Sequence, residues 1–203
     1  MIRKTVFLLL VLTGILPFAC CPEQPTGPYK VELREVYPLK SSYMGQTSTE
    51  APPHFLKPDE NYQGDTLLLN LSFYSLLAQY QPVVSLYAST LALSCDDYPN
   101  FTQLQDKITS VDLYSDQPFQ GIPAGEPLTE KMSVYRYDDS KIISLAQAIT
   151  NINTLNFYEG MERGLGTLVL AGKPNQLAVR TFTVRIAYES GIEETVTSIP
   201  VRW

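Results

Sequence analysis

The sequence predicts a mainly β protein: a two-layer antiparallel β-sandwich of the immunoglobulin-like kind with one short helical insert. Two observations lead to this prediction. Apolar and polar residues alternate in several short stretches, and Pro- or Gly-rich connections separate those stretches. A chain of 203 residues, 44% of them hydrophobic, is long and apolar enough to bury one core. We therefore expect a single β-sandwich domain over residues 29–203.

Several stretches in the first half of the chain have the composition of strands, at 30–36, 66–74, 83–95 and 108–115. In 66–74, Leu67, Leu69 and Leu71 fall on one face, and Asn70 and Ser72 fall on the other. This period of two is typical of a strand that buries one face. Residues 41–62 contain three prolines and are expected to form a long irregular loop.

The alternation is clearest near the C-terminus. One face carries Phe182, Val184, Ile186 and Tyr188, and the other carries Thr181, Thr183, Arg185 and Glu189. Ser190-Gly191 then favours a tight turn. We expect residues 195–203 to return as the partner strand, with Ile199, Val201 and Trp203 aligned on one face.

One segment has the periodicity of a helix. Residues 138–140, Asp-Asp-Ser, offer side-chain oxygens that suit an N-cap. Apolar residues then recur at helical spacing at Ile142, Leu145, Ala146 and Ile149. The pattern predicts a helix that ends near Asn151.

The first 19 residues have the pattern of an export signal that is removed. Arg3 and Lys4 precede an apolar run that is too short to span a bilayer, and Ala19 directly precedes Cys20. This pattern predicts cleavage before Cys20 and acylation of its thiol, with residues 20–28 as a Pro-rich tether. The expected location is the cell envelope, on the outer membrane, with the lipid on Cys20 as the membrane contact. An ordinary secretory signal with cleavage elsewhere is the alternative.

Charge and residue types narrow the functional classes. A net charge of −6 and no basic cluster argue against nucleic acid as a partner. His54 is the single histidine and lies in a Pro-rich loop, so a site built from several histidines is excluded. The sequence predicts no catalytic residue, cofactor site or metal site. Adjacent acidic pairs, such as 138–139 and 193–194, are explained by helix capping and by solvation of a hairpin.

Two cysteines are left once Cys20 carries lipid. Cys21 and Cys95 would lie in a compartment that permits disulfides, so they are a candidate pair. The alternative is a buried Cys95 with Cys21 free in the tether. The sequence leaves both arrangements open.

Several segments in order resemble a known class of proteins. They are Cys20-Cys21 and the stretches 108–115 (ITSVDLYS), 123–128 (PAGEPL), 166–174 (GTLVLAGKP) and 181–191 (TFTVRIAYESG). Together they resemble Bacteroidetes lipoproteins of about 200 residues whose domain has no known function. The resemblance implies an envelope lipoprotein and carries over no catalytic residue. In that context Asp65-Thr66-Leu67 matches a short O-glycosylation pattern at Thr66, although Thr66 also suits the start of a strand.

These observations favour a non-catalytic envelope lipoprotein that binds or assembles with another protein or a glycan. The alternative is a secreted hydrolase that acts on glycans through carboxylates alone. A deep pocket with two facing carboxylates favours the hydrolase, and a flat or aromatic-lined surface favours the binding module.

The Cys20 thiol provides a direct test of the lipid anchor. Replacement of Cys20 by serine is expected to abolish incorporation of labelled palmitate and to release the chain from the membrane fraction, because no thiol is left to acylate. The matched variant Cys21→Ser is expected to keep both properties. Mass spectrometry of the mature N-terminus is the measurement, and an unmodified thiol at residue 20 would contradict the anchor.

Overall fold

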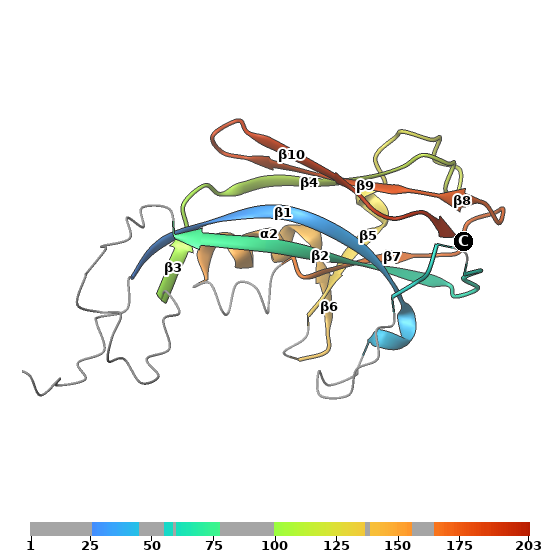
Figure 1. Ribbon diagram of the computed structural model, residues 1–203, viewed down its shortest axis with the longest axis horizontal. Coiled ribbons are helices and arrows are strands. Elements are labelled where there is room, and N and C mark those ends of the chain that lie inside the picture. Colours follow the sequence, from blue (N-terminus) through green and yellow to red (C-terminus); the bar gives the residue numbers. More distant parts are fainter. Residues whose placement is uncertain (1–25, 45–54, 59, 78–99, 137–138, 156–164) are drawn as a thin grey trace, which may run out of the picture.

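The computed structural model describes residues 26–44, 55–58, 60–77, 100–136, 139–155 and 165–203. Two sheets face each other across an apolar core, and α2 is the one α-helix of these residues (Figure 1). The fold is mainly β and sandwich-like with one helix, which confirms the predicted fold class. The predicted strands at 83–95 lie outside the described residues.

The lower layer in Figure 1 is a six-stranded sheet with the order β3-β1-β2-β7-β5-β6. Its strands are β1 (Thr26–Lys40), β2 (Thr66–Leu77), β3 (Asn100–Leu104), β5 (Met132–Tyr135), β6 (Ile142–Ser144) and β7 (Thr167–Ala171). Neighbouring strands are antiparallel except β1 and β3, which run parallel. Short 3-10 turns follow β1 (η1, Ser41–Tyr43) and precede β5 (η2, Thr129–Lys131).

The upper layer is a three-stranded sheet with the order β10-β9-β4. It contains β4 (Ile108–Ser115), β9 (Phe182–Tyr188) and β10 (Glu193–Thr197). The four apolar residues predicted to share a face of β9 are all buried. The hairpin of β9 and β10 confirms the predicted terminal hairpin.

The predicted return strand is wrong beyond Thr197. The Ser198 hydroxyl accepts a hydrogen bond from the Phe182 amide and donates to the Ile199 carbonyl, and Pro200 follows with no N–H to continue the ladder. Ile199 is therefore partly exposed, not aligned in the core. The chain instead forms β11 (Val201–Arg202), which pairs with β8 (Val179–Arg180).

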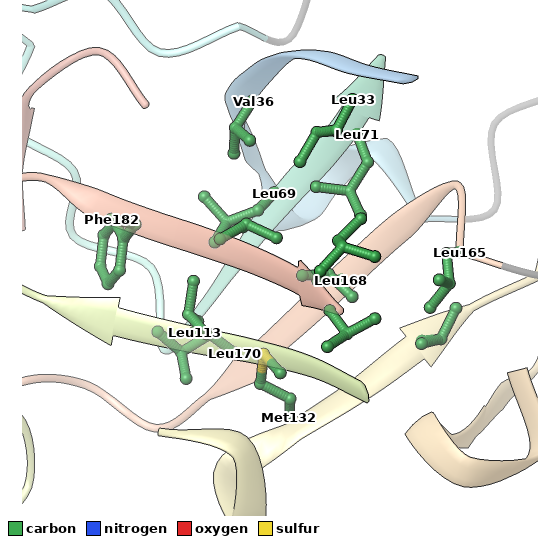
Figure 2. Close-up of a cluster of buried hydrophobic side chains, with 14 of the residues drawn as sticks. Leu33, Val36, Leu69, Leu71, Leu113, Met132, Leu165, Leu168, Leu170 and Phe182 are labelled. Atoms are coloured by element: carbon green, nitrogen blue, oxygen red, sulfur yellow. The ribbon is translucent and has the colours of Figure 1, made fainter. Parts of the chain in front are cut away.

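The core lies where the inward faces of the two layers meet. Figure 2 shows apolar side chains from β1, β2, β4, β5, β7 and β9 converging there. Leu69, Leu113, Leu170 and Phe182 are all fully buried. Truncation of one such leucine to alanine typically costs about 2–5 kcal/mol, so this cluster is the main source of stability.

A polar contact joins the two layers at one side. β1 has a bulge between Leu33 and Glu35, and the Leu33 amide donates to the Glu194 carboxylate of β10 at 2.8 Å. The Tyr188 hydroxyl donates to the same carboxylate oxygen at 3.0 Å. Burial and the nearby Glu194 charge raise the pKa of Tyr188. Because an unpaired amide is costly inside a protein, this contact stabilises the seam between β1 and β10.

The helix begins later than the sequence predicts. α2 spans Leu145–Thr154, and its N-cap is Ser144, whose hydroxyl accepts from the Gln147 amide at 3.2 Å. Ile142, expected inside the helix, belongs to β6, which pairs with β5. Ser140 has a positive φ of 55°, which marks a turn. No helix among the described residues has the length and apolar character needed to span a bilayer.

A cluster of aromatic rings lies at the end of the sandwich where β11 pairs with β8. The Trp203 indole is fully buried, and its ring centroid lies 5.4 Å from that of Phe119 and 6.0 Å from that of Tyr62. Its N–H donates to the Gly64 carbonyl at 2.7 Å. The donor is therefore satisfied although the ring is out of contact with water.

Buried tyrosines predict loss of stability at alkaline pH. Burial raises the pKa of Tyr29 from 10.0 to about 12. Between these values the unfolded chain loses the phenolic proton while the folded chain keeps it, so the free energy of unfolding falls as pH rises from about 10 to 12. Urea unfolding followed by circular dichroism measures this decline. Tyr29→Phe is expected to make this decline shallower, and a slope equal to that of the parent protein would contradict the assignment.

Candidate functional site

Most residues singled out from the sequence lie outside the described part of the chain. These are Cys20, Cys21, Cys95 and His54. The lipid anchor, the disulfide and the loop position of His54 therefore stay predictions.

Thr66 is described, and it is the first residue of β2, as its alternative interpretation predicted. It pairs with Ala171 of β7, and its carbonyl accepts a hydrogen bond from the Tyr62 hydroxyl. Its side chain is half-buried. O-glycosylation at Thr66 stays a prediction.

Two residues from the predicted acidic pairs, Asp139 and Glu194, have roles that differ from the expected ones, and Asp138 lies outside the described residues. Asp139 forms ion pairs with Arg136 at 3.3 Å and Lys141 at 2.9 Å, so it stabilises the turn before β6 and does not cap the helix. Glu193 and Glu194 are neighbours in a strand and point to opposite faces, with Glu194 in the seam to β1. Within the described ranges, no group of three or more His, Cys, Asp or Glu residues is placed to hold a metal ion.

The outer face of the three-stranded sheet carries a network of polar side chains. The core-facing residues of β4 and β9 are buried, and the residues between them face outward. The strand register aligns the outward residues in three rows, Tyr114–Thr183–Thr197, Asp112–Arg185–Thr195 and Ser110–Ala187–Glu193. In Figure 1 no described helix or strand lies on the outer side of this layer.

Arg185 is the centre of this surface. One terminal nitrogen (Nη2) lies 3.4 Å from the Asp112 carboxylate, and the other (Nη1) lies 4.0 Å from the Glu193 carboxylate. Its guanidinium carbon lies 5.3 Å from the centroid of the Tyr114 ring, within the range of a cation–π contact. The hydrogen bond to Asp112 raises the pKa of Arg185 further, with smaller contributions from Tyr114 and Glu193. The side chain is therefore a permanent cation that contacts two carboxylates and one aromatic ring.

The groups around Arg185 extend this polar network. The second Asp112 oxygen accepts a hydrogen bond from the Thr129 hydroxyl at 3.0 Å, and the Thr183 and Thr197 hydroxyls lie 3.0 Å apart. The Arg185 side chain is still 41% exposed. The surface therefore presents donors, acceptors and an aromatic ring in a fixed pattern, which suits recognition of a partner.

Local sequence patterns do not identify this site. Thr183 and Arg185 fall on the polar face of a predicted strand, but no pattern assigns a role to Asp112 or Tyr114. The signal that could have pointed to them is the outward position of both residues in the strand 108–115. Their meeting with Arg185 depends on a strand register between segments far apart in the chain.

Comparisons with protein-family models, with curated proteins and with solved structures give no match to this chain. The functional assignment therefore depends on the geometry of the chain itself.

We predict that Arg185 contributes little to stability. Arg185→Met is expected to change the free energy of unfolding by less than about 1 kcal/mol, because exposed ion pairs are weak. The contrasting variant is Arg180→Met. Arg180 is 1% exposed and donates to the Pro118 and Gln176 carbonyls, so its loss is expected to cost about 1–3 kcal/mol. Urea unfolding measures the free energy of unfolding of both variants. Equal destabilisation by the two substitutions would show that Arg185 has a structural role.

Proposed function

We propose that this chain is a lipid-anchored protein of the cell envelope that binds another protein through the outer face of β4, β9 and β10. It is a binding module with no catalytic role. The single observation that carries the proposal is the cluster of Arg185, Tyr114, Asp112 and Glu193 on a sheet face that no described element covers.

The residue types of this face favour a protein partner. Arginine and tyrosine are enriched among the residues that contribute most to protein–protein binding, and threonine hydroxyls supply hydrogen bonds around them. Stacking of a sugar requires a free aromatic face, whereas the guanidinium of Arg185 already lies over the Tyr114 ring. A glycan partner is therefore less well supported.

The described carboxylates also favour binding over hydrolysis. Glycan hydrolysis needs two carboxyl groups that face each other across a bond, one of them available as an acid. Asp112 is occupied by Arg185 and Thr129, and Glu194 is occupied by Leu33 and Tyr188. These contacts leave neither of the two carboxyl groups available as the acid of a hydrolase.

The predicted lipid on Cys20 complements a binding role. An acylated chain is confined to the membrane surface, so a partner in the same envelope meets it at a high effective concentration. A modest polar interface is then sufficient for association.

Photo-crosslinking in intact cells tests the proposal. A crosslinking amino acid at Thr183, on the proposed face, is expected to yield one discrete adduct with an envelope protein. The matched position is Tyr74, which is 49% exposed and lies on the six-stranded sheet, and it is expected to yield no such adduct.

The charge reversal Arg185→Glu is expected to abolish the adduct at Thr183, because it places a third acid between Asp112 and Glu193. The same adducts from both positions, or an adduct that does not depend on Arg185, would contradict the proposal. Circular dichroism of the variant confirms that the fold is kept.

A further inference from the structure

The outer edge of β10 has a defined direction of hydrogen bonding. Beside this strand, the Ser198 amide donates to the Phe182 carbonyl at 2.8 Å, and the Tyr188 amide donates to the Ile192 carbonyl at 2.9 Å. Hydrogen-bonded pairs alternate along an antiparallel ladder. The even-numbered residues of β10 therefore direct their backbone groups to β9, and the odd-numbered residues direct theirs away from it.

The residues whose backbone groups point away from β9 are Glu193, Thr195 and Thr197. Within the described part of the chain, the N–H and C=O groups of these residues make no hydrogen bond. β1 lies nearby, but its direct polar contact with β10 is the Leu33 amide on the Glu194 side chain. β10 is therefore a sheet edge with three unpaired residues.

Other edges of the same sandwich are protected. The outer edge of β4 is covered by a neighbouring segment, because its Leu113 and Ser115 carbonyls accept from the amides of Leu128 and Gly125. The edge of β1 is interrupted by the bulge at Leu33 and by Pro38, which has no N–H. β10 has no proline, lysine or bulge, and its one inward-pointing charge, Glu194, already accepts hydrogen bonds from the Leu33 amide and the Tyr188 hydroxyl. Its edge is thus open to pairing with another strand.

We propose that β10 pairs with β10 of a second copy of this chain, antiparallel about a two-fold axis at Thr195. In this register Thr195 meets Thr195 of the second copy, and Glu193 meets Thr197. Each of these pairs exchanges two backbone hydrogen bonds, because all three residues direct their groups to the same edge. Such a contact is isologous and closes after two copies.

The side chains on the outer face suit this register. Glu193 meets a threonine hydroxyl of the other copy, so no carboxylate stands opposite another. Thr–Thr pairs across strands are favourable, and the central pair is of this kind. Pairing joins the two three-stranded sheets into one continuous sheet that carries Arg185 twice. The dimer goes beyond the proposed function, because it does not depend on the partner that the outer face binds.

Disulfide trapping of the full lipidated chain tests the dimer in its own membrane. In a background with Cys21→Ser and Cys95→Ser, the variant Thr195→Cys is expected to form a covalent dimer on mild oxidation. Paired residues at such an axis have Cα atoms about 5.5 Å apart, within the range of a disulfide. Thr183→Cys is the control on the same face, and β9 of one copy lies about 14 Å from β9 of the other, so it is expected to stay monomeric.

Backbone substitution at Thr195 gives a second, independent measurement. Thr195→Pro removes the outward N–H and leaves the bonds to β9 intact, and it is expected to weaken dimerisation about tenfold or more in sedimentation of the detergent-solubilised chain. Thr195→Val keeps the amide and is expected to dimerise like the parent. Equal trapping at residues 183 and 195, no trapping at either, or unchanged dimerisation of Thr195→Pro would overturn the proposal. Absence of a dimer in the parent chain, with the Thr183 crosslinked adduct retained, would overturn the dimer alone and leave the proposed function standing.

Discussion

Burial of the leucine-rich inner face of the six-stranded sheet determines the arrangement of the molecule. Leu69 and Leu170 need an apolar cover, and the inward residues of β4 and β9 supply it. Because side chains alternate along a strand, a slip of one residue would turn the whole buried set of β9 toward solvent. The core therefore fixes the register, and the register in turn places Asp112 opposite Arg185 on the outer face.

The sequence predicts best where the alternation is strong and local. The strands 108–115 and 66–74 were expected within a few residues of their bounds, because their apolar residues recur with period two. The predicted start of the helix is wrong because Ser140 lies in a turn, and the helix is capped by Ser144, another serine four residues later. Leu68, on the face of 66–74 expected to be polar, is buried in a second small cluster with Leu39 and Val169.

The candidate site could not be predicted from the sequence for a different reason. Asp112 and Arg185 are 73 residues apart, and Leu33 and Glu194 are 161 residues apart. Each of these residues has an ordinary identity for its strand, so no local pattern marks it. Such contacts follow from the pairing order of the strands, and that order is set by the packing of the whole core. The prediction of a lipid anchor, in contrast, is based on a local pattern of residues 1–20 and needs no long-range contact.

The position of Trp203 has a spectroscopic consequence. The chain has a single tryptophan, so its fluorescence comes from one place, the end of the sandwich where β11 meets β8. The buried indole is surrounded by aromatic rings and donates its N–H to a carbonyl, so its emission lies at shorter wavelength than that of an indole in water. Local unfolding of this end exposes the indole to water and shifts its emission to longer wavelength, even while the strands elsewhere stay paired. The chain thus carries its own optical reporter of local opening.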